Sequence, residues 1–338
     1  MAKSLAGSEG LLPVTDWSHG RFGKSGPWAS PGVRTATTLV VLWAILLGVT
    51  GVLDPSFVSD EALLAIAFNM AVVGVLSAGV AVLVISGGLL DLSIPTSTGL
   101  SALCTAVVLN HVGSWPAAIA GIACGCGIGL TNGLLIVATK VNPIVITLAV
   151  NFAGEGVLNM AFGQEFPLLK SGLHDLGLSN FIGVPTITWL MFGVLLLTGL
   201  GLSHTRYGRR AIAVGGNSIA AKRQGISLAR ARIATFGFMG LCAGIAGVLY
   251  ASQSQIISPG DTSDLLFPAI TAVILSGFSL QGGRGSFPVL ILGIGLLSTI
   301  PTSLIALGAT PDWTQLAQGL LLVFAVSLDG FRIKRGRR

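Results

Sequence analysis

The chain contains too few charged residues to cover a water-soluble surface. Only 9% of its 338 residues are Asp, Glu, Lys or Arg, 52% are hydrophobic, and the mean hydropathy is +0.84. Ordinary soluble domains carry about 25% charged residues. Apolar segments close to the length that crosses a ~30 Å hydrocarbon core recur from Thr35 to Leu328. The composition therefore predicts an all-α polytopic membrane protein and excludes a water-soluble domain.

Side chains arranged for catalysis or for metal binding are equally scarce. The four histidines are scattered, and the four cysteines all lie within apolar segments. Cys124 and Cys126 are two residues apart, a spacing that points their thiols to different faces of a helix and disfavours a metal or disulfide role. The sequence shows no metal-ligand cluster and no phosphate-binding loop. We therefore predict no catalytic residue, no metal site and no cofactor on this chain.

The N-terminal region lacks the features of a cleaved signal peptide, because residues 1–34 contain no apolar core of about 7–15 residues. We expect residues 1–34 to form a flexible cytoplasmic tail, residues 35–329 a transmembrane domain, and residues 330–338 a basic cytoplasmic tail. Ten spans are expected within the transmembrane domain, at about 35–53, 62–86, 95–110, 115–138, 144–162, 186–203, 232–252, 265–280, 286–307 and 314–328.

The basic residues give the expected orientation in the membrane. With the N-terminus inside, every one of the 19 Lys and Arg residues except Lys170 falls in a cytoplasmic segment, as the positive-inside rule requires. Both termini are then inside, residues 163–185 form an outer loop suited to a partner or a gate, and residues 204–231 form an inner loop. The net charge of +6 is thereby explained by topology, and no nucleic-acid partner is expected.

Glycine marks both packing and breaks in the expected helices. In the fourth span, glycine recurs at every fourth position from Gly121 to Gly133, which favours close approach of a second helix backbone. Paired glycines also interrupt the chain after the second span and after the eighth. We assign these breaks as gating candidates, with tight turns as the alternative. Their residues are Gly87, Gly88, Asp91, Ser93, Gly282, Gly283 and Arg284.

A polar face in the fifth span is the best candidate for a translocation pathway. Asn151, Glu155 and Asn159 are four residues apart, so they share one face of a helix. An ionisable group within a bilayer costs at least ~2.5 kcal/mol and usually faces a cavity or a partner. The alternative is that Glu155 is hydrated at the outer interface. Asn69 and Asn132 are further lining candidates, or else residues that bridge helices.

The inner loop predicts a short helix outside the membrane. Asn217 is a favourable N-cap, and Gly225 stands where a C′ glycine would end the helix. A helix of about two turns is marginal alone in water. We therefore expect it to pack against another surface.

Several of these motifs occur in the order and spacing of one known family. They are Gly87-Gly-Leu-Leu-Asp-Leu-Ser, Asn132-Gly-Leu-Leu, Thr147-Leu, Gly208-Arg, Gly215-Gly-Asn, Ala220-Ala-Lys-Arg-Gln-Gly-Ile and Ser279-Leu-Gln-Gly-Gly-Arg-Gly-Ser. From about residue 60 to its C-terminus, the chain resembles the permease subunits of ribose-type bacterial ABC importers. The resemblance implies a coupling helix at 217–225 that binds a cytoplasmic ATPase, the subunit that holds ATP and magnesium. The positions implied in this coupling are Asn217, Ala220, Ala221 and Gly225.

The resemblance also implies the location and the other partners. The location is the bacterial inner membrane. The other partners are a periplasmic or lipid-anchored substrate-binding protein and a second permease, in a homodimer or heterodimer. Two positions depart from the family pattern, because Ile219 stands where the coupling loop often has an acid and Glu155 where an arginine is expected.

Import of a monosaccharide or related polyol is the expected function, without bond chemistry on this chain. Autoinducer-2, a nucleoside or an amino acid are alternative solutes. A stand-alone secondary transporter and a membrane-embedded enzyme are rival functions. The first usually needs paired intramembrane acids and the second a catalytic cluster, and the spans contain neither.

Overall fold

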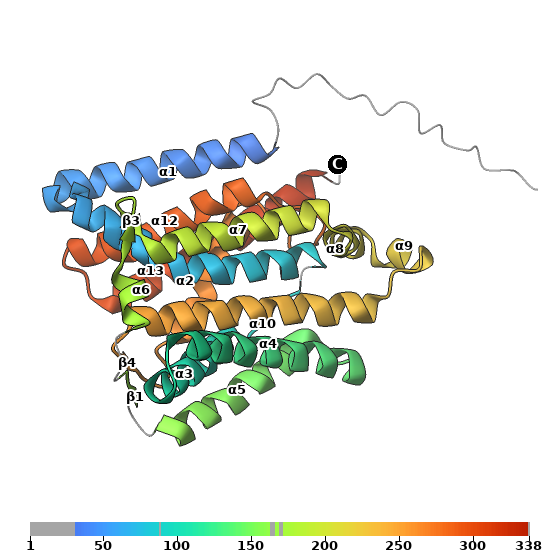
Figure 1. Cartoon of the computed structure of the whole chain (residues 1–338). Coiled ribbons are helices and arrows are strands. Elements are labelled where there is room, and N and C mark those ends of the chain that lie inside the picture. Colours follow the sequence, from blue (N-terminus) through green and yellow to red (C-terminus); the bar gives the residue numbers. More distant parts are fainter. Residues whose placement is uncertain (1–30, 88, 163–165, 169–171, 337–338) are drawn as a thin grey trace, which may run out of the picture.

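The structure is a computed structural model that describes residues 31–87, 89–162, 166–168 and 172–336. Ten helices lie where the ten spans were expected, and most of them run along one common direction (Figure 1). They are α1 (Pro31–Leu53), α2 (Asp60–Ile85), α3 (Ile94–His111), α4 (Ser114–Thr139), α5 (Pro143–Phe162), α7 (Thr186–His204), α10 (Leu228–Gln253), α11 (Leu266–Leu275), α12 (Phe287–Ala306) and α13 (Pro311–Gly336). Most of the expected N-terminal tail and parts of the outer loop lie outside the described residues.

Short elements gather at the two ends of this bundle. Helices α8 (Arg206–Gly216) and α9 (Ser218–Arg223) lie at one end, whereas α6 (His174–Leu178), β1 (Phe166–Pro167), β3 (Val184–Pro185) and β4 (Ile256–Ile257) lie at the other (Figure 1). The remaining short elements are η3 (Pro55–Val58), β2 (Asn180–Phe181) and η4 (Ser263–Leu265). Strand β1 pairs antiparallel with β4, and β2 with β3. The loops that were assigned to opposite sides of the membrane are therefore at opposite ends of the molecule.

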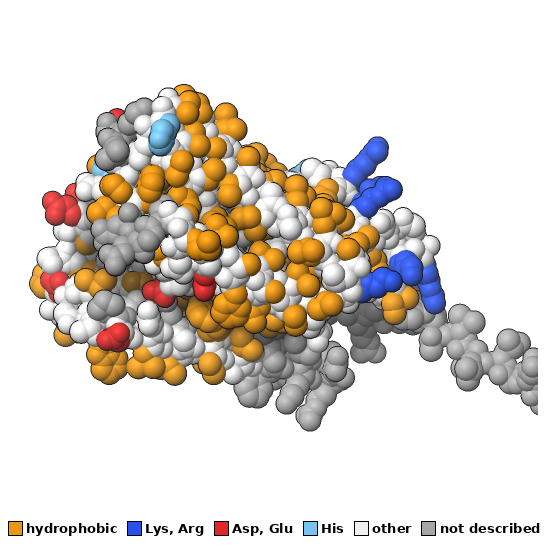
Figure 2. All heavy atoms as spheres, turned by 90° about the horizontal axis from the view of Figure 1, so that it is seen from below, with side chains coloured by type: hydrophobic (Ala, Val, Ile, Leu, Met, Phe, Trp, Pro, Cys, Tyr) orange, Lys and Arg blue, Asp and Glu red, His pale blue; other side chains and the backbone are white. Residues whose placement is uncertain are grey.

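Charge follows the same division. On the face shown in Figure 2, Lys and Arg side chains gather at one end and Asp and Glu side chains at the other, with hydrophobic side chains between them. Seven helices in the described residues are long and apolar enough to cross a bilayer, namely α1, α2, α4, α5, α7, α10 and α12. The prediction of an all-α polytopic membrane protein is confirmed.

The eighth expected span, 265–280, is wrong in length. Helix α11 has 10 residues, which is about 15 Å and half of a ~30 Å hydrocarbon core. It ends because Gly277 adopts φ +86°, so that its N–H bonds to Ile274 O and the N–H of Phe278 to Val273 O. This is the Schellman termination that a glycine after a helix favours.

Helix α2 forms the centre of the bundle. Every residue from Gly74 to Ile85 is buried, and α7, α10, α11 and α12 pack around it. A helix that is apolar on all faces is stable only in such a surrounded position. The break that follows Ile85 therefore starts inside the protein, where its polar groups need protein partners.

Helices α4 and α10 pack through the predicted glycine stripe. The four stripe glycines, Gly121, Gly125, Gly129 and Gly133, are all buried. A Cβ atom on Gly125 would lie 2.5 Å from Gly244 Cα, and one on Gly133 would lie 2.8 Å from Ile233 Cα. Neither site has room for a side chain, so the packing interpretation of the stripe is confirmed.

Candidate functional site

The break after α2 holds a buried, hydrogen-bonded acid. Asp91 Oδ1 accepts hydrogen bonds from Ser93 N at 2.8 Å and from Ser93 Oγ at 2.6 Å. Asn132 of α4 donates from Nδ2 to Ser93 Oγ at 2.7 Å. All three residues are buried. Ser93 occupies the N-cap position of α3, but its hydroxyl bonds to Asp91 and makes no capping bond. The structure thus joins two gating candidates to one pathway candidate.

A second polar line runs along α5. Thr96 of α3 donates from Oγ1 to Asn151 Oδ1 at 3.1 Å, and Asn151 Nδ2 donates to Glu155 Oε1 at 2.8 Å. Asn159 Nδ2 donates to the backbone oxygen of Glu155 at 2.9 Å. The three polar residues that the sequence placed on one face are therefore linked directly. We call Thr96, Asn151, Glu155 and Asn159 the α5 polar line.

The α5 polar line opens into a small cavity. The cavity has a volume of about 240 Å³ and is lined by Glu155, Leu158, Asn159, Pro259 and Gly260. The last two residues follow β4, so the cavity lies toward the end of the molecule opposite α8 and α9. Glu155 is partly buried. Its carboxylate can therefore meet water or a solute that enters at this end.

Two other predicted site residues stand apart from these networks. Asn69 is exposed on α2, and Arg284 is exposed after α11. Through the contacts described above, neither residue is hydrogen-bonded to Asp91 and its two partners or to the α5 polar line. Gly88 lies outside the described residues.

The inner loop contains the expected short helix with both caps in place. Asn217 Oδ1 accepts from Ile219 N at 3.1 Å and from Ala220 N at 3.0 Å. At the other end, Gly225 has φ +79°, and its N–H bonds to Lys222 O at 3.0 Å. The N–H of Ile226 bonds to Ala221 O at 3.1 Å, which completes a Schellman motif. The predicted local structure of residues 217–225 is confirmed.

Helix α9 has one buried and one exposed side. Ala221 is buried and Ala220 is exposed, while the Ile219 side chain is 68% exposed. The preceding helix α8 was not predicted. It packs on the bundle through Gly208, Ala211 and Val214. An apolar side chain thus projects from the end of the molecule at which basic residues gather.

The two glycine breaks meet each other. Gly87, Gly282 and Gly283 have φ values of +139°, +89° and +75°, which favour glycine. Gly283 N donates to Ile85 O at 2.8 Å, so the connection after α11 bonds to the last residue of α2. The two breaks are therefore in direct contact, and their role in gating stays a prediction.

Sequence reasoning gave no site role to two threonines that connect these networks, although one of them, Thr147, lies in a motif of the family. Thr147 Oγ1 accepts from Leu92 N at 3.0 Å, between Asp91 and Ser93. It lies four residues before Asn151, so the four-residue spacing of the polar face could have been extended to it. Thr96 belongs to another helix, and its bond to Asn151 depends on the register between α3 and α5.

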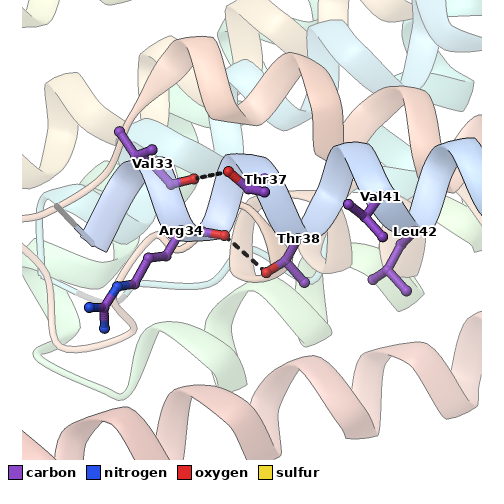
Figure 3. A pocket seen from close by; sticks show the side chains of 6 residues that line it. All are labelled: Val33, Arg34, Thr37, Thr38, Val41 and Leu42. Atoms are coloured by element: carbon purple, nitrogen blue, oxygen red, sulfur yellow. Dashed lines mark hydrogen bonds between the residues drawn. The ribbon is translucent and has the colours of Figure 1, made fainter. Parts of the chain in front are cut away.

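The larger of the two described cavities has no comparable chemistry. It has a volume of about 630 Å³ and is lined by Val33, Arg34, Thr37, Thr38, Val41 and Leu42, all on α1 (Figure 3). The Thr37 and Thr38 hydroxyls donate to the backbone oxygens of Val33 and Arg34 in the preceding turn. We therefore do not assign it as a site.

Residues 62–326 match a family model described as the branched-chain amino acid transport system / permease component. The chain belongs to this permease family. It is 29% identical to the L-arabinose transport system permease protein AraH of Escherichia coli (strain K12), over 99% of both chains. It is 32% identical to the autoinducer 2 import system permease protein LsrC of Klebsiella pneumoniae, over 86% of this chain and 84% of that one.

A third relative bears directly on the expected family. The ribose import permease protein RbsC of Bacillus subtilis (strain 168) is 30% identical, over 84% of this chain and 89% of its own. The resemblance to ribose-type importer permeases is thus confirmed, and the protein is a multi-pass permease of the bacterial inner membrane. No solved structure matches the chain.

Proposed function

We propose that this permease is the membrane-spanning subunit of an ABC importer for a monosaccharide or a related polyol. Relatives named for L-arabinose and ribose align with most of the chain, which supports a small hydroxyl-rich solute. A cytoplasmic ATPase hydrolyses ATP, an outer binding protein delivers the solute, and two permease subunits enclose the path. This chain itself catalyses no bond chemistry.

Helix α9 is the observation that carries the proposal. It is capped at both ends, packs on α8 with Ala221 buried, and exposes Ile219 at the basic end of the molecule. A six-residue helix gains little stability of its own, so the double cap indicates a fixed docking surface. An exposed isoleucine there suits a groove on an ATPase and would bind by apolar contact where relatives of the family often use an acid.

The α5 polar line supplies the path in this proposal. Asn151 donates to the Glu155 carboxylate and Asn159 donates to the Glu155 backbone oxygen, and Glu155 and Asn159 line the cavity. Sugar hydroxyls both donate and accept, so they can replace such bonds one by one. Because a sugar is neutral, it brings no opposite charge to the Glu155 carboxylate, and its hydroxyl groups can solvate that carboxylate by hydrogen bonds.

Orientation is part of the proposal and can be tested separately. We infer that α9 faces the cytoplasm and β2 faces outside, since the basic residues gather around α8 and α9. In a background with the four native cysteines replaced by serine, Asn180→Cys and Ser218→Cys would be labelled in intact cells. We expect an impermeant thiol reagent to label the first variant only. Labelling of the second variant alone would overturn the orientation.

The coupling role is tested at Gly225, whose φ is +79°. Gly225→Val places a β-branched residue in a left-handed conformation, whereas Asn tolerates that conformation. We expect Gly225→Val to lose ATPase co-purification and uptake while it is inserted normally, and Gly225→Asn to retain both. Wild-type uptake by Gly225→Val would reject the role of α9.

The solute class is tested by uptake into vesicles that contain the permease, its ATPase and its binding protein. The panel includes L-arabinose, ribose, a hexose, autoinducer-2, a nucleoside and a branched-chain amino acid. ATP-dependent uptake of a sugar or polyol supports the proposal. Autoinducer-2 is the second candidate, because the LsrC relative is 32% identical. Uptake driven by an ion gradient without ATP would favour a secondary transporter instead.

A further inference from the structure

Three glycine-containing segments meet by main-chain contact where the inner loop joins the bundle. They are Ile85–Gly87 at the end of α2, Gly215–Gly216 at the end of α8, and Gly282–Gly283 between α11 and α12. We call them the glycine junction. In Figure 1, α8 lies at the ends of α2 and α7, and α9 extends away from it.

No side chain separates the segments of the glycine junction. A Cβ atom on Gly215 would overlap Ile85 O and lie 2.9 Å from Gly283 N. A Cβ atom on Gly282 would lie 2.7 Å from Gly215 O and 3.0 Å from Gly87 Cα. Backbone atoms cannot turn away as the end of a flexible side chain can. The contact at Gly215 is therefore closed to every residue except glycine.

A hydrogen bond fixes two of the three segments to each other. The last carbonyls of a helix have no partner within that helix, and Ile85 O belongs to this group in α2. Gly283 N supplies the missing donor at 2.8 Å. Because the end of α2 is buried, loss of this bond would leave a buried polar group without a partner, which is destabilising.

The third segment leads directly to the docking helix. Gly216 is the last residue of α8, and the next residue, Asn217, is the N-cap of α9. Helix α8 is also held to α10, since Tyr207 Oη donates to Thr235 Oγ1 at 3.2 Å. Movement of α9 must therefore act on the end of α8, and through Gly215 on Ile85 and Gly283.

We propose that Gly215 is a positioning residue of the transport cycle, which keeps the coupling loop in main-chain contact with both helix breaks. Displacement of α9 by the ATPase then moves the ends of α2 and α12 as one unit. The break after α2 leads on to Asp91 and Ser93, so the same displacement reaches the hydrogen bonds that these two residues make. This inference rests on the proposed function.

The test compares Gly215→Ala with Gly216→Ala. Both changes add one methyl group to neighbouring positions of the same helix, but a Cβ on Gly216 has nothing within 4 Å. In reconstituted complexes we expect Gly215→Ala to bind the ATPase within about twofold of wild type and to retain ATP hydrolysis. Solute moved per ATP should fall roughly tenfold, within the range of typical coupling energies. Gly216→Ala should match wild type. Wild-type coupling in Gly215→Ala, or equal losses in both variants, would overturn the proposal.

A second measurement uses the wild-type complex, so it does not depend on how well a variant folds. Amide hydrogen exchange is compared with and without a non-hydrolysable ATP analogue. We expect residues 78–87, 206–226 and 278–286 to change together. A change confined to 206–226 would overturn the inference. If the wild-type permease binds no ATPase at all, it is the proposed function that fails.

Discussion

Helices α4 and α10 associate in a different way from α3 and α5. The first pair is in direct backbone contact through glycines, with Gly125 against Gly244 and Gly129 against Gly240. The second pair is joined by a side-chain hydrogen bond from Thr96 to Asn151, which continues to Glu155. Lipid gives apolar helices little reason to associate, so close packing and polar bonds are the two available means.

We propose that this difference separates two parts of the molecule. The frame is the part held rigid by backbone contact, and the path is the part whose polar side chains a solute can meet. A backbone contact without side chains offers nothing that a solute could replace, and it resists deformation because protein interiors are close-packed. Hydroxyl and amide groups can exchange their partners for the hydroxyls of a sugar. Helix α10 is the more buried partner in the first pair, whereas α4 and α5 are both largely at the surface of this single chain. We therefore propose that α4 and α10 belong to the frame and that α5 lines the path.

The largest expected effect is on the frame. Gly125→Val should destabilise the permease by roughly 3 kcal/mol, because a side chain there meets the backbone of α10 and overpacking is costly. Gly127→Val is the matched control, since that glycine is exposed with nothing within 4 Å of its Cβ. Thermal unfolding in detergent measures the difference. Equal melting temperatures for the two variants would contradict the assignment of α4 and α10 to the frame.

Local signals predicted much of the molecule. Hydropathy located ten helices because a membrane forces apolar segments of a set length. Asn217 and Gly225 predicted α9 because caps act within a few residues. The four-residue spacing of glycine predicted the packing face of α4, and that of Asn151 and Glu155 predicted a shared polar face. In each case, the deciding contacts lie within one helix or depend on one face of it.

Interactions between segments could not be predicted in this way. The bond between Thr96 and Asn151 depends on the register of α3 against α5, which neither sequence segment specifies alone. The meeting of Gly215 with Ile85 joins residues far apart in the chain. The early end of α11 had a local signal at Gly277, but apolar residues continue past it. Helix α8 was missed because glycines at both ends resemble a loop.

A smaller effect is expected in the path, on transport more than on stability. Glu155→Gln keeps the shape of the side chain and its bond from Asn151 but removes the charge, so the uptake rate should fall about fivefold. Glu155→Leu also leaves Asn151 Nδ2 without its partner and should lower uptake about thirtyfold, which corresponds to about 2 kcal/mol of lost hydrogen bonding. Initial uptake rates across the solute panel measure both. Wild-type rates at normal insertion levels would show that Glu155 is only an interfacial residue.

The smallest expected effect is on the bond that joins α3 to α5. Thr96→Val keeps the volume of the side chain but removes the hydroxyl, whose one proton is shared between Asn151 Oδ1 and Ser93 O. Hydrogen bonds between membrane helices average about 0.6 kcal/mol in double-mutant cycles, so the loss of stability should be near that value. Thr131→Val is the control, because that hydroxyl is exposed and donates within α4 to Gly127 O.

A double-mutant cycle of Thr96→Val with Asn151→Ala isolates the bond from other effects of each change. We expect a coupling energy of about 0.6 kcal/mol in unfolding experiments, and a smaller value when saturating sugar is present. The decrease follows if solute hydroxyls replace Thr96 as partners of Asn151. A coupling energy that is the same with and without sugar would mean that this bond belongs to the frame, and the boundary between frame and path would then lie between Asn151 and Glu155.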